Sequence, residues 1–176
     1  MACGNEELCK TNQDKAYKAW NEASEYYQRM AELKRKERDD VSAEARLHTE
    51  ERERHERAAA VARYRQTTGL EDAETGQKYI DPADAKRHGQ AARAANGRAN
   101  ATANDEEVVI AEAMAIDEVI AELERKSRSA ARIRDLAKGD PKAAWAAASA
   151  GVSLSGTELV GLAAEASRAA NEVCSR

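Results

Sequence analysis

The sequence predicts an all-α protein made of long extended helices, and two features of its composition support this fold class. Charged residues make up 34% of the 176 residues, whereas aromatic residues make up 4% and Phe is absent. The chain holds nine Gly and two Pro, which leaves long stretches free of helix breakers. Such a composition is typical of coiled coils and long helices. Because alanine supplies much of the hydrophobic content and buries little area, we expect little independent core.

The first half of the chain is predicted to form one long charged helix over residues 13–66, preceded by a polar tail over residues 1–12. The stretch 13–66 lacks Gly and Pro and is rich in strong helix formers. Alternating steps of four and three residues give an apolar stripe at its start: Ala16, Trp20, Ala23, Tyr27 and Met30. Continued in the same register, the stripe becomes polar and then Ala-rich, which favours a solvent-bridging strut over a continuous zipper.

Residues 67–104 are expected to form a Gly- and Asn-rich connector, with a weak helix near residues 82–95. The Asp81-Pro82 pair suits a helix start, because Asp caps the first turn and Pro fits its first position. Gly89 and Gly97 each cost a helix roughly 1 kcal/mol relative to Ala. We therefore expect this helix to be short.

Residues 105–138 carry the clearest heptad pattern of the chain. The predicted seam is broken at Arg134 and otherwise consists of Val109, Ala113, Ile116, Ile120, Leu123, Ser127, Ala130 and Ala137. This helix can pair with residues 13–66 as an antiparallel hairpin within one chain, or it can pack mainly on other subunits. Of its residues, Ile116, Ile120 and Leu123 are predicted to make protein contacts.

Residues 140–176 are expected to form a short Ala-rich helix–turn–helix. Asp140-Pro141 repeats the Asp-Pro helix start, Gly151 and Gly156 mark the turn, and Ser155 with Glu158 resembles a capping box. The predicted protein-contact residues of this segment are Trp145, Leu159 and Leu162. Residues 143–164 contain a single carboxylate over a length that could cross a bilayer. The Gly and Ser residues favour a close-packed hairpin, and membrane contact is a possible second state.

No catalytic or cofactor-binding signature is present, so the sequence predicts no enzyme, no cofactor and no metal site. His48 and His55 lie seven residues apart, but neither follows a Glu at the spacing that four-helix di-iron sites require. The net charge of −4 comes from interspersed charges and argues against specific nucleic-acid recognition.

Cysteine placement and the N-terminal sequence bear on the compartment. Cys3, Cys9 and Cys174 lie at the two ends without a CxxC pair, so we expect free thiols rather than a terminal disulfide. The first ten residues lack the apolar region of a secretory signal, which predicts synthesis in the cytoplasm without signal-directed secretion.

A small-residue helix followed by Gly-Val-x-Leu-x-Gly-Thr occupies residues 143–157. This segment resembles the corresponding turn in small internal virion proteins of short-tailed bacteriophages, and the similarity extends over about residues 142–171. The resemblance implies an Ala-rich helical protein inside the capsid, stacked on the portal and ejected with the genome to act at the host envelope.

Two functions from different classes are therefore predicted. The first is a structural phage virion protein, internal or at the portal–tail axis, that forms a homo-oligomer and contacts portal or core proteins. The alternative is a cytoplasmic coiled-coil binding or inhibitor module, which would grip a partner protein through a patch formed by Trp20, Tyr27 and Met30.

Overall fold

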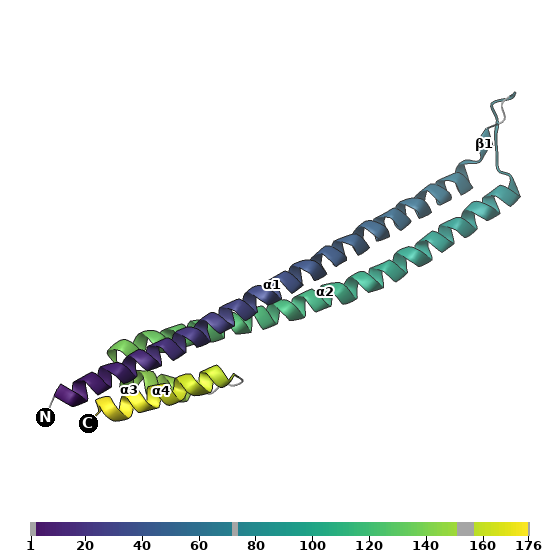
Figure 1. Ribbon diagram of the computed structural model, residues 1–176. Coiled ribbons are helices and arrows are strands. Elements are labelled where there is room, and N and C mark those ends of the chain that lie inside the picture. The colour runs from purple at the N-terminus through teal and green to yellow at the C-terminus, as the bar shows by residue number, and fades with distance from the viewer. Residues whose placement is uncertain (1–2, 72–73, 151–156, 176) are drawn as a thin grey trace. The chain divides into compact units, whose positions relative to one another are not determined.

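The all-α fold class is confirmed by the computed structural model, which describes residues 3–71, 74–150 and 157–175. The elements follow one another as α1 (Cys3–Thr68), β1 (Leu70–Glu71), β2 (Lys78–Tyr79), α2 (Pro82–Gly139), α3 (Pro141–Ala150) and α4 (Glu158–Cys174) (Figure 1). The chain divides into two compact units. We call residues 1–36 and 116–176 the terminal unit, and residues 37–115 the hairpin unit.

The hairpin unit consists of an antiparallel pair of helical segments closed by a two-stranded ribbon. Strands β1 and β2 pair antiparallel, with Leu70 opposite Tyr79. Gly69 precedes β1 with a φ of 69°, and a Cβ at this position would lie 2.5 Å from the backbone oxygen of Tyr79. The left-handed backbone and the close approach both require glycine, so Gly69 sets the turn out of α1.

The predicted connector over residues 67–104 is wrong in its second half, because α2 runs without a break from Pro82 to Gly139. Packing against α1 explains this. The buried side chains of this part of the hairpin unit are small: Ala59, Ala62, Ala92, Ala95, Ala99 and Thr102. Burying this face on α1 offsets the propensity cost of Gly89 and Gly97. Gly89 also suits close packing, since a Cβ there would lie 2.9 Å from Nε2 of Gln66.

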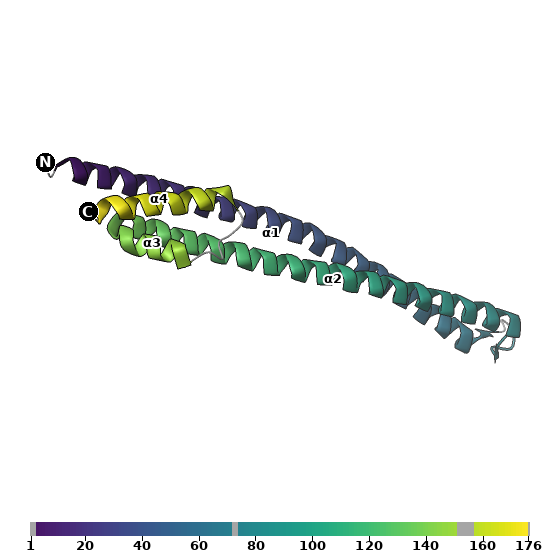
Figure 2. The ribbon, with the colours of Figure 1, turned by 90° about the horizontal axis from the view of Figure 1, so that it is seen from below.

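The terminal unit brings four helical segments together: the first part of α1, the last part of α2, and both short helices. In two views the N-terminal turns of α1 and the C-terminal turns of α4 lie at the same end (Figures 1 and 2). Its core contains three large side chains, Trp20, Tyr27 and Ile133, among alanines. The core is therefore thin, as the composition predicted.

The polar tail predicted over residues 1–12 is also wrong, because α1 already begins at Cys3. The early turns of α1 have a neighbour that the sequence did not reveal, since Cys9 is joined to Cys174 at the end of α4. The predicted capping box is wrong as well. Thr157 occupies the N-cap position of α4 without a side-chain cap, which puts Glu158 at the first helical position rather than the third.

The apolar stripe of α1 follows the predicted register as far as Tyr27; beyond it, every second seam position moves by one residue. Ala31 is buried, whereas Met30 is only half-buried. Two successive steps of four, from Ala23 to Tyr27 and from Tyr27 to Ala31, amount to a stutter in the heptad pattern. Beyond it, the seam continues through nine buried or half-buried positions, with Ser42 and Thr49 half-buried beside it: Lys34, Arg38, Val41, Ala45, His48, Arg52, His55, Ala59 and Ala62. Glu37, Glu44, Glu51 and Ala58, which the unshifted register places on the seam, are exposed.

The seam predicted on residues 105–138 is confirmed. Each of its eight positions from Val109 to Ala137 is buried or half-buried, and Arg134 is half-buried on the same stripe. Ser24 on α1 and Ser127 on α2 are hydrogen-bonded within the terminal unit, so these two helices pair inside one chain. The intrachain hairpin is thus the arrangement found.

Candidate functional site

The predicted patch of Trp20, Tyr27 and Met30 does not form an exposed surface. Trp20 is 1% exposed and Tyr27 is 3% exposed, and both belong to the core of the terminal unit. Met30 is half-buried at the position where the stutter turns it away from the seam. The chain uses the two rings for its own packing, so the predicted gripping patch is wrong.

The other predicted contact residues divide between interior and surface. Ile116 and Ile120 are buried on α2, whereas Leu123 and Trp145 are half-buried against the core of the terminal unit. Leu159 is half-buried and Leu162 is 54% exposed. The predicted turn residues Gly151 and Gly156 lie outside the described residues. Of the nine contact residues, Leu162 alone is classed as exposed.

A buried hydrogen bond joins α4 to α1 in the terminal unit. Trp20 Nε1 donates a 2.8 Å hydrogen bond to Oγ of Ser167, and both side chains are almost completely buried. Around this bond α4 presents small buried residues, Ala163 and Ala170. Because a buried indole N–H requires an acceptor, Ser167 fixes the position of α4 along α1.

A disulfide joins the two ends of the terminal unit, so the predicted free thiols are wrong for two of the three cysteines. Cys9 on α1 and Cys174 at the end of α4 form the bond, with their Cα atoms 5.0 Å apart. Both residues are half-buried, which leaves them near the surface. The bond closes a sequence separation of 165 residues. Nothing in the local sequence reveals such a pairing.

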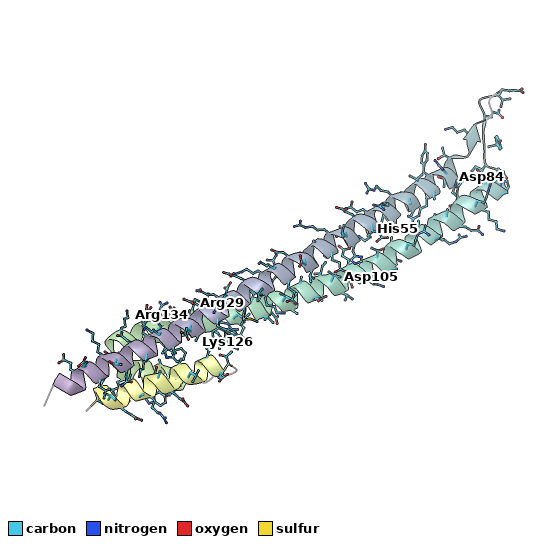
Figure 3. All side chains as sticks on the ribbon, in the orientation of Figure 1. Arg29, His55, Asp84, Asp105, Lys126 and Arg134 are labelled. Atoms are coloured by element: carbon cyan, nitrogen blue, oxygen red, sulfur yellow. A yellow bond between two sulfur atoms is a disulfide. The ribbon has the colours of Figure 1, made fainter. Side chains whose placement is uncertain are left out.

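Three further contacts hold α1 and α2 together in the terminal unit. Ser24 and Ser127 each donate from Oγ to the backbone oxygen of the other, at 3.2 Å. This reciprocal pair requires a close approach of the two helix backbones, which small side chains allow. Nearby, Lys138 Nζ lies 4.0 Å from the centre of the Tyr17 ring, a cation–π contact. Arg134, which is labelled in Figure 3, donates a hydrogen bond to Asn21.

The seam of the hairpin unit carries a polar cluster that sequence reasoning did not identify. Glu106 is 9% exposed; its Oε1 accepts a 2.8 Å hydrogen bond from Thr49, and its Oε2 lies 3.0 Å from Arg52 Nη1. The unshifted register placed Glu51 on the seam instead of Arg52, which concealed this ion pair. A buried carboxylate paired in this way fixes the register between two helices, because slippage would leave it unpaired.

The three histidines all lie in the hairpin unit, and each stands one turn after a carboxylate. The distance from His48 Nε2 to Glu44 Oε1 is 3.9 Å, and the distance from His55 Nε2 to Glu51 Oε1 is 3.6 Å. Figure 3 marks His55 on α1. Over the described parts of the chain, no three His, Cys, Asp or Glu side chains are placed to hold a metal ion.

A cavity of the hairpin unit lies beside the turn from α1 to α2. It measures about 320 Å³, and its lining includes Tyr64, Arg65, Asp81, Asp84 and His88. The charged groups in it have local roles. Asp81 accepts the hydrogen bond of the Ala83 backbone N–H, and Asp84 pairs with Arg87 and His88.

One carboxyl of the terminal unit has a perturbed pKa. The ammonium of Lys126 donates a hydrogen bond to Glu122, with the two charged atoms 2.7 Å apart, and this bond lowers the pKa of Glu122. The positive charge of the same Lys126 acts in the same direction. Glu122 is exposed, so this is a surface ion pair within one helix.

Comparison with known proteins gives no relationship. No protein-family model matches the chain, and no curated protein or solved structure is detectably similar to it. Within the described residues, no helix has both the length and the apolar character needed to cross a membrane.

Proposed function

We propose that this chain is a non-catalytic structural protein of a short-tailed phage particle, where it acts as a homo-oligomer among internal or portal-associated proteins. The class of particle rests on the resemblance over residues 143–157. The structural role is supported by one observation on the hairpin unit: apart from Val109, its fully buried side chains in the described residues are small or polar, whereas several large apolar side chains lie outside.

In a helical pair that is stable by itself, large apolar side chains lie at the seam and small or polar ones lie outside, which is the reverse of this distribution. Ala59, Ala92 and Glu106 occupy the buried seam, whereas Leu47 and Val108 are about two-thirds exposed. Leucine and valine buried at a seam would contribute roughly 1.5–3 kcal/mol each. Their placement on the outer surface supports contacts with further chains in an assembly, because exposed apolar side chains gain free energy when a neighbour covers them.

Two experiments test this proposal. Mass spectrometry of purified particles should detect the chain at a fixed copy number per particle, and its absence from them would exclude the virion assignment. In solution, light scattering should give a mass above that of the monomer. Val108→Lys and Met114→Lys should lower this mass, whereas Ala94→Lys, an exposed site on the same helix, should leave it unchanged.

The alternative of a cytoplasmic binding module loses the patch on which it depended. A partner could reach Trp20 only if α4 moved away from α1, since Ser167 covers the indole N–H. The exposed side chains of Leu47 and Val108 favour an assembly with identical copies or particle proteins over this alternative. A single host protein recovered by the full chain, with none of the particle proteins, would favour the alternative.

A further inference from the structure

We propose that the Cys9–Cys174 disulfide is a redox latch that holds α4 against α1. When a dithiol reduces this bond, α4 separates from α1 and uncovers Trp20, while the paired parts of α1 and α2 stay folded. The inference concerns the terminal unit alone and does not depend on the proposed function.

The first argument is that the attachment of α4 to α1 is weak apart from the disulfide, while α4 also packs on α3. Its fully buried residues are Ala163, Ser167 and Ala170, three of the smallest side chains, and Val160 is only half-buried against the core. The area that each removes from water is small, so their hydrophobic contribution is small as well. In the described part of α4, the ion pair between Arg168 and Glu172 joins two residues of the helix itself.

The second argument concerns the buried hydrogen bond between α4 and α1 in the described part of the chain, whose protein partner water can replace. Trp20 Nε1 donates to Ser167 Oγ at 2.8 Å. After separation, water can accept a hydrogen bond from the indole N–H and donate one to the serine hydroxyl. The net free-energy cost of breaking the Trp20–Ser167 bond is therefore modest. Separation costs far more while the disulfide holds the end of α4 within a few ångströms of α1.

The third argument is that α1 and α2 do not need α4 to stay paired. Within the terminal unit they share the reciprocal Ser24–Ser127 hydrogen bonds, and Arg134 on α2 donates to Asn21 on α1. Tyr27 of α1 and Ile133 of α2 also belong to the core of the terminal unit. Opening of α4 is therefore a local event rather than global unfolding.

The chemistry of opening is ordinary thiol–disulfide exchange. A thiolate of the dithiol attacks one sulfur of the Cys9–Cys174 bond, which breaks that bond, forms a mixed disulfide and releases the other cysteine as a thiolate. The second thiol of the reductant then displaces the bound cysteine. The products are two protein thiols and one oxidised, disulfide-bonded reductant. Both cysteines are half-buried rather than enclosed, so a small dithiol can approach them.

Hydrogen exchange of the full chain with and without dithiothreitol tests the proposal. Reduction should speed exchange of the α4 amides by at least about tenfold and leave the α2 amides of the hairpin unit unchanged. Cys174→Ser should exchange like the reduced chain without reductant. Cys3→Ser, which keeps the Cys9–Cys174 bond, should behave like the unmodified chain in both conditions.

A second measurement follows the indole directly. In a Trp145→Phe background, where Trp20 is the remaining tryptophan, acrylamide should quench its fluorescence more strongly after reduction. Unchanged α4 exchange and unchanged quenching after reduction would overturn the latch. A loss of helicity throughout the chain would also overturn it, because the bond would then be a general staple for the fold.

Discussion

Replacing Ser167 by Ala isolates the hydrogen bond that positions α4. The substitution removes one oxygen atom and leaves the Trp20 indole N–H without an acceptor in a site where Trp20 is 1% exposed. An unsatisfied buried donor costs about 1–3 kcal/mol. Alanine has a better helix propensity than serine by roughly 0.5 kcal/mol. We therefore expect a net loss of about 1–2 kcal/mol in the free energy of unfolding.

Urea unfolding, followed by circular dichroism with the disulfide closed, measures this loss. Ser149→Ala is the matched control, since Ser149 lies exposed on α3 and its Oγ bonds only to the Trp145 backbone oxygen one turn earlier. That control should change stability by less than about 0.5 kcal/mol. A double-mutant cycle with Trp20→Phe should give a coupling energy near 1 kcal/mol. If Ser167→Ala proves as stable as Ser149→Ala, the assigned role of the bond is refuted.

Three further predictions concern other contacts. Glu106→Ala should lower the free energy of unfolding by about 1–3 kcal/mol, measured in urea, because Thr49 and Arg52 on α1 lose their hydrogen bond and ion pair with the buried carboxylate; Glu106→Gln should cost less. Gly69→Ala should destabilise the chain, since its φ is positive and the new Cβ would clash with a backbone oxygen, whereas Gly97→Ala should stabilise it by about 0.5–1 kcal/mol. Lys126→Met should raise the pKa of Glu122 toward its usual value, as followed by NMR titration. Because the folded-state pKa of Glu122 is lowered, the stabilisation from this pair is present above the unfolded-state pKa and is lost as the pH falls through the folded one.

Most of the fold was predictable from the sequence because local pattern decides it. The seam over residues 105–138 has strong apolar periodicity, and the structure buries it as expected. The weak points were positions where local propensity and packing disagree. Gly89 and Gly97 indicated a break, yet the small residues around them pack on α1 and keep α2 continuous. A propensity cost of roughly 1 kcal/mol per glycine is too small to outweigh a paired helix face.

The candidate site was less predictable because it depends on residues far apart in the chain. Cys9 and Cys174 meet only because α1 and α4 lie side by side, and neither neighbourhood carries a sign of its partner. The same is true of Trp20 and Ser167, which are 147 residues apart. The apolar stripe marked Trp20 as a contact residue, but periodicity could not show that its partner was within the chain.

The disulfide also changes how the proposed function fits the compartments involved. In a reducing cytoplasm the cysteines of a newly made chain are free thiols, whereas the Cys9–Cys174 disulfide persists in an oxidising environment. Under the proposed function, the chain would therefore assemble reduced, with α4 free, and close the latch once outside the cytoplasm. Under that proposal, the two states would come before and after release of the particle or its contents.

The stutter in α1 can be tested by comparing the same substitution at two neighbouring residues, Met30 and Ala31, because the two registers bury different ones. Ala31 is 2% exposed whereas Met30 is half-buried, so Ala31→Glu would place a carboxylate in the seam without a partner. This should cost about 3 kcal/mol or more, while Met30→Glu should cost less than about 1 kcal/mol. An uninterrupted heptad from Ala16 predicts the opposite order, because it places Met30 inside and Ala31 outside. Urea unfolding of the two variants therefore decides between the registers: a larger loss for Met30→Glu would show that α1 has no stutter and that Arg52 does not belong on the seam.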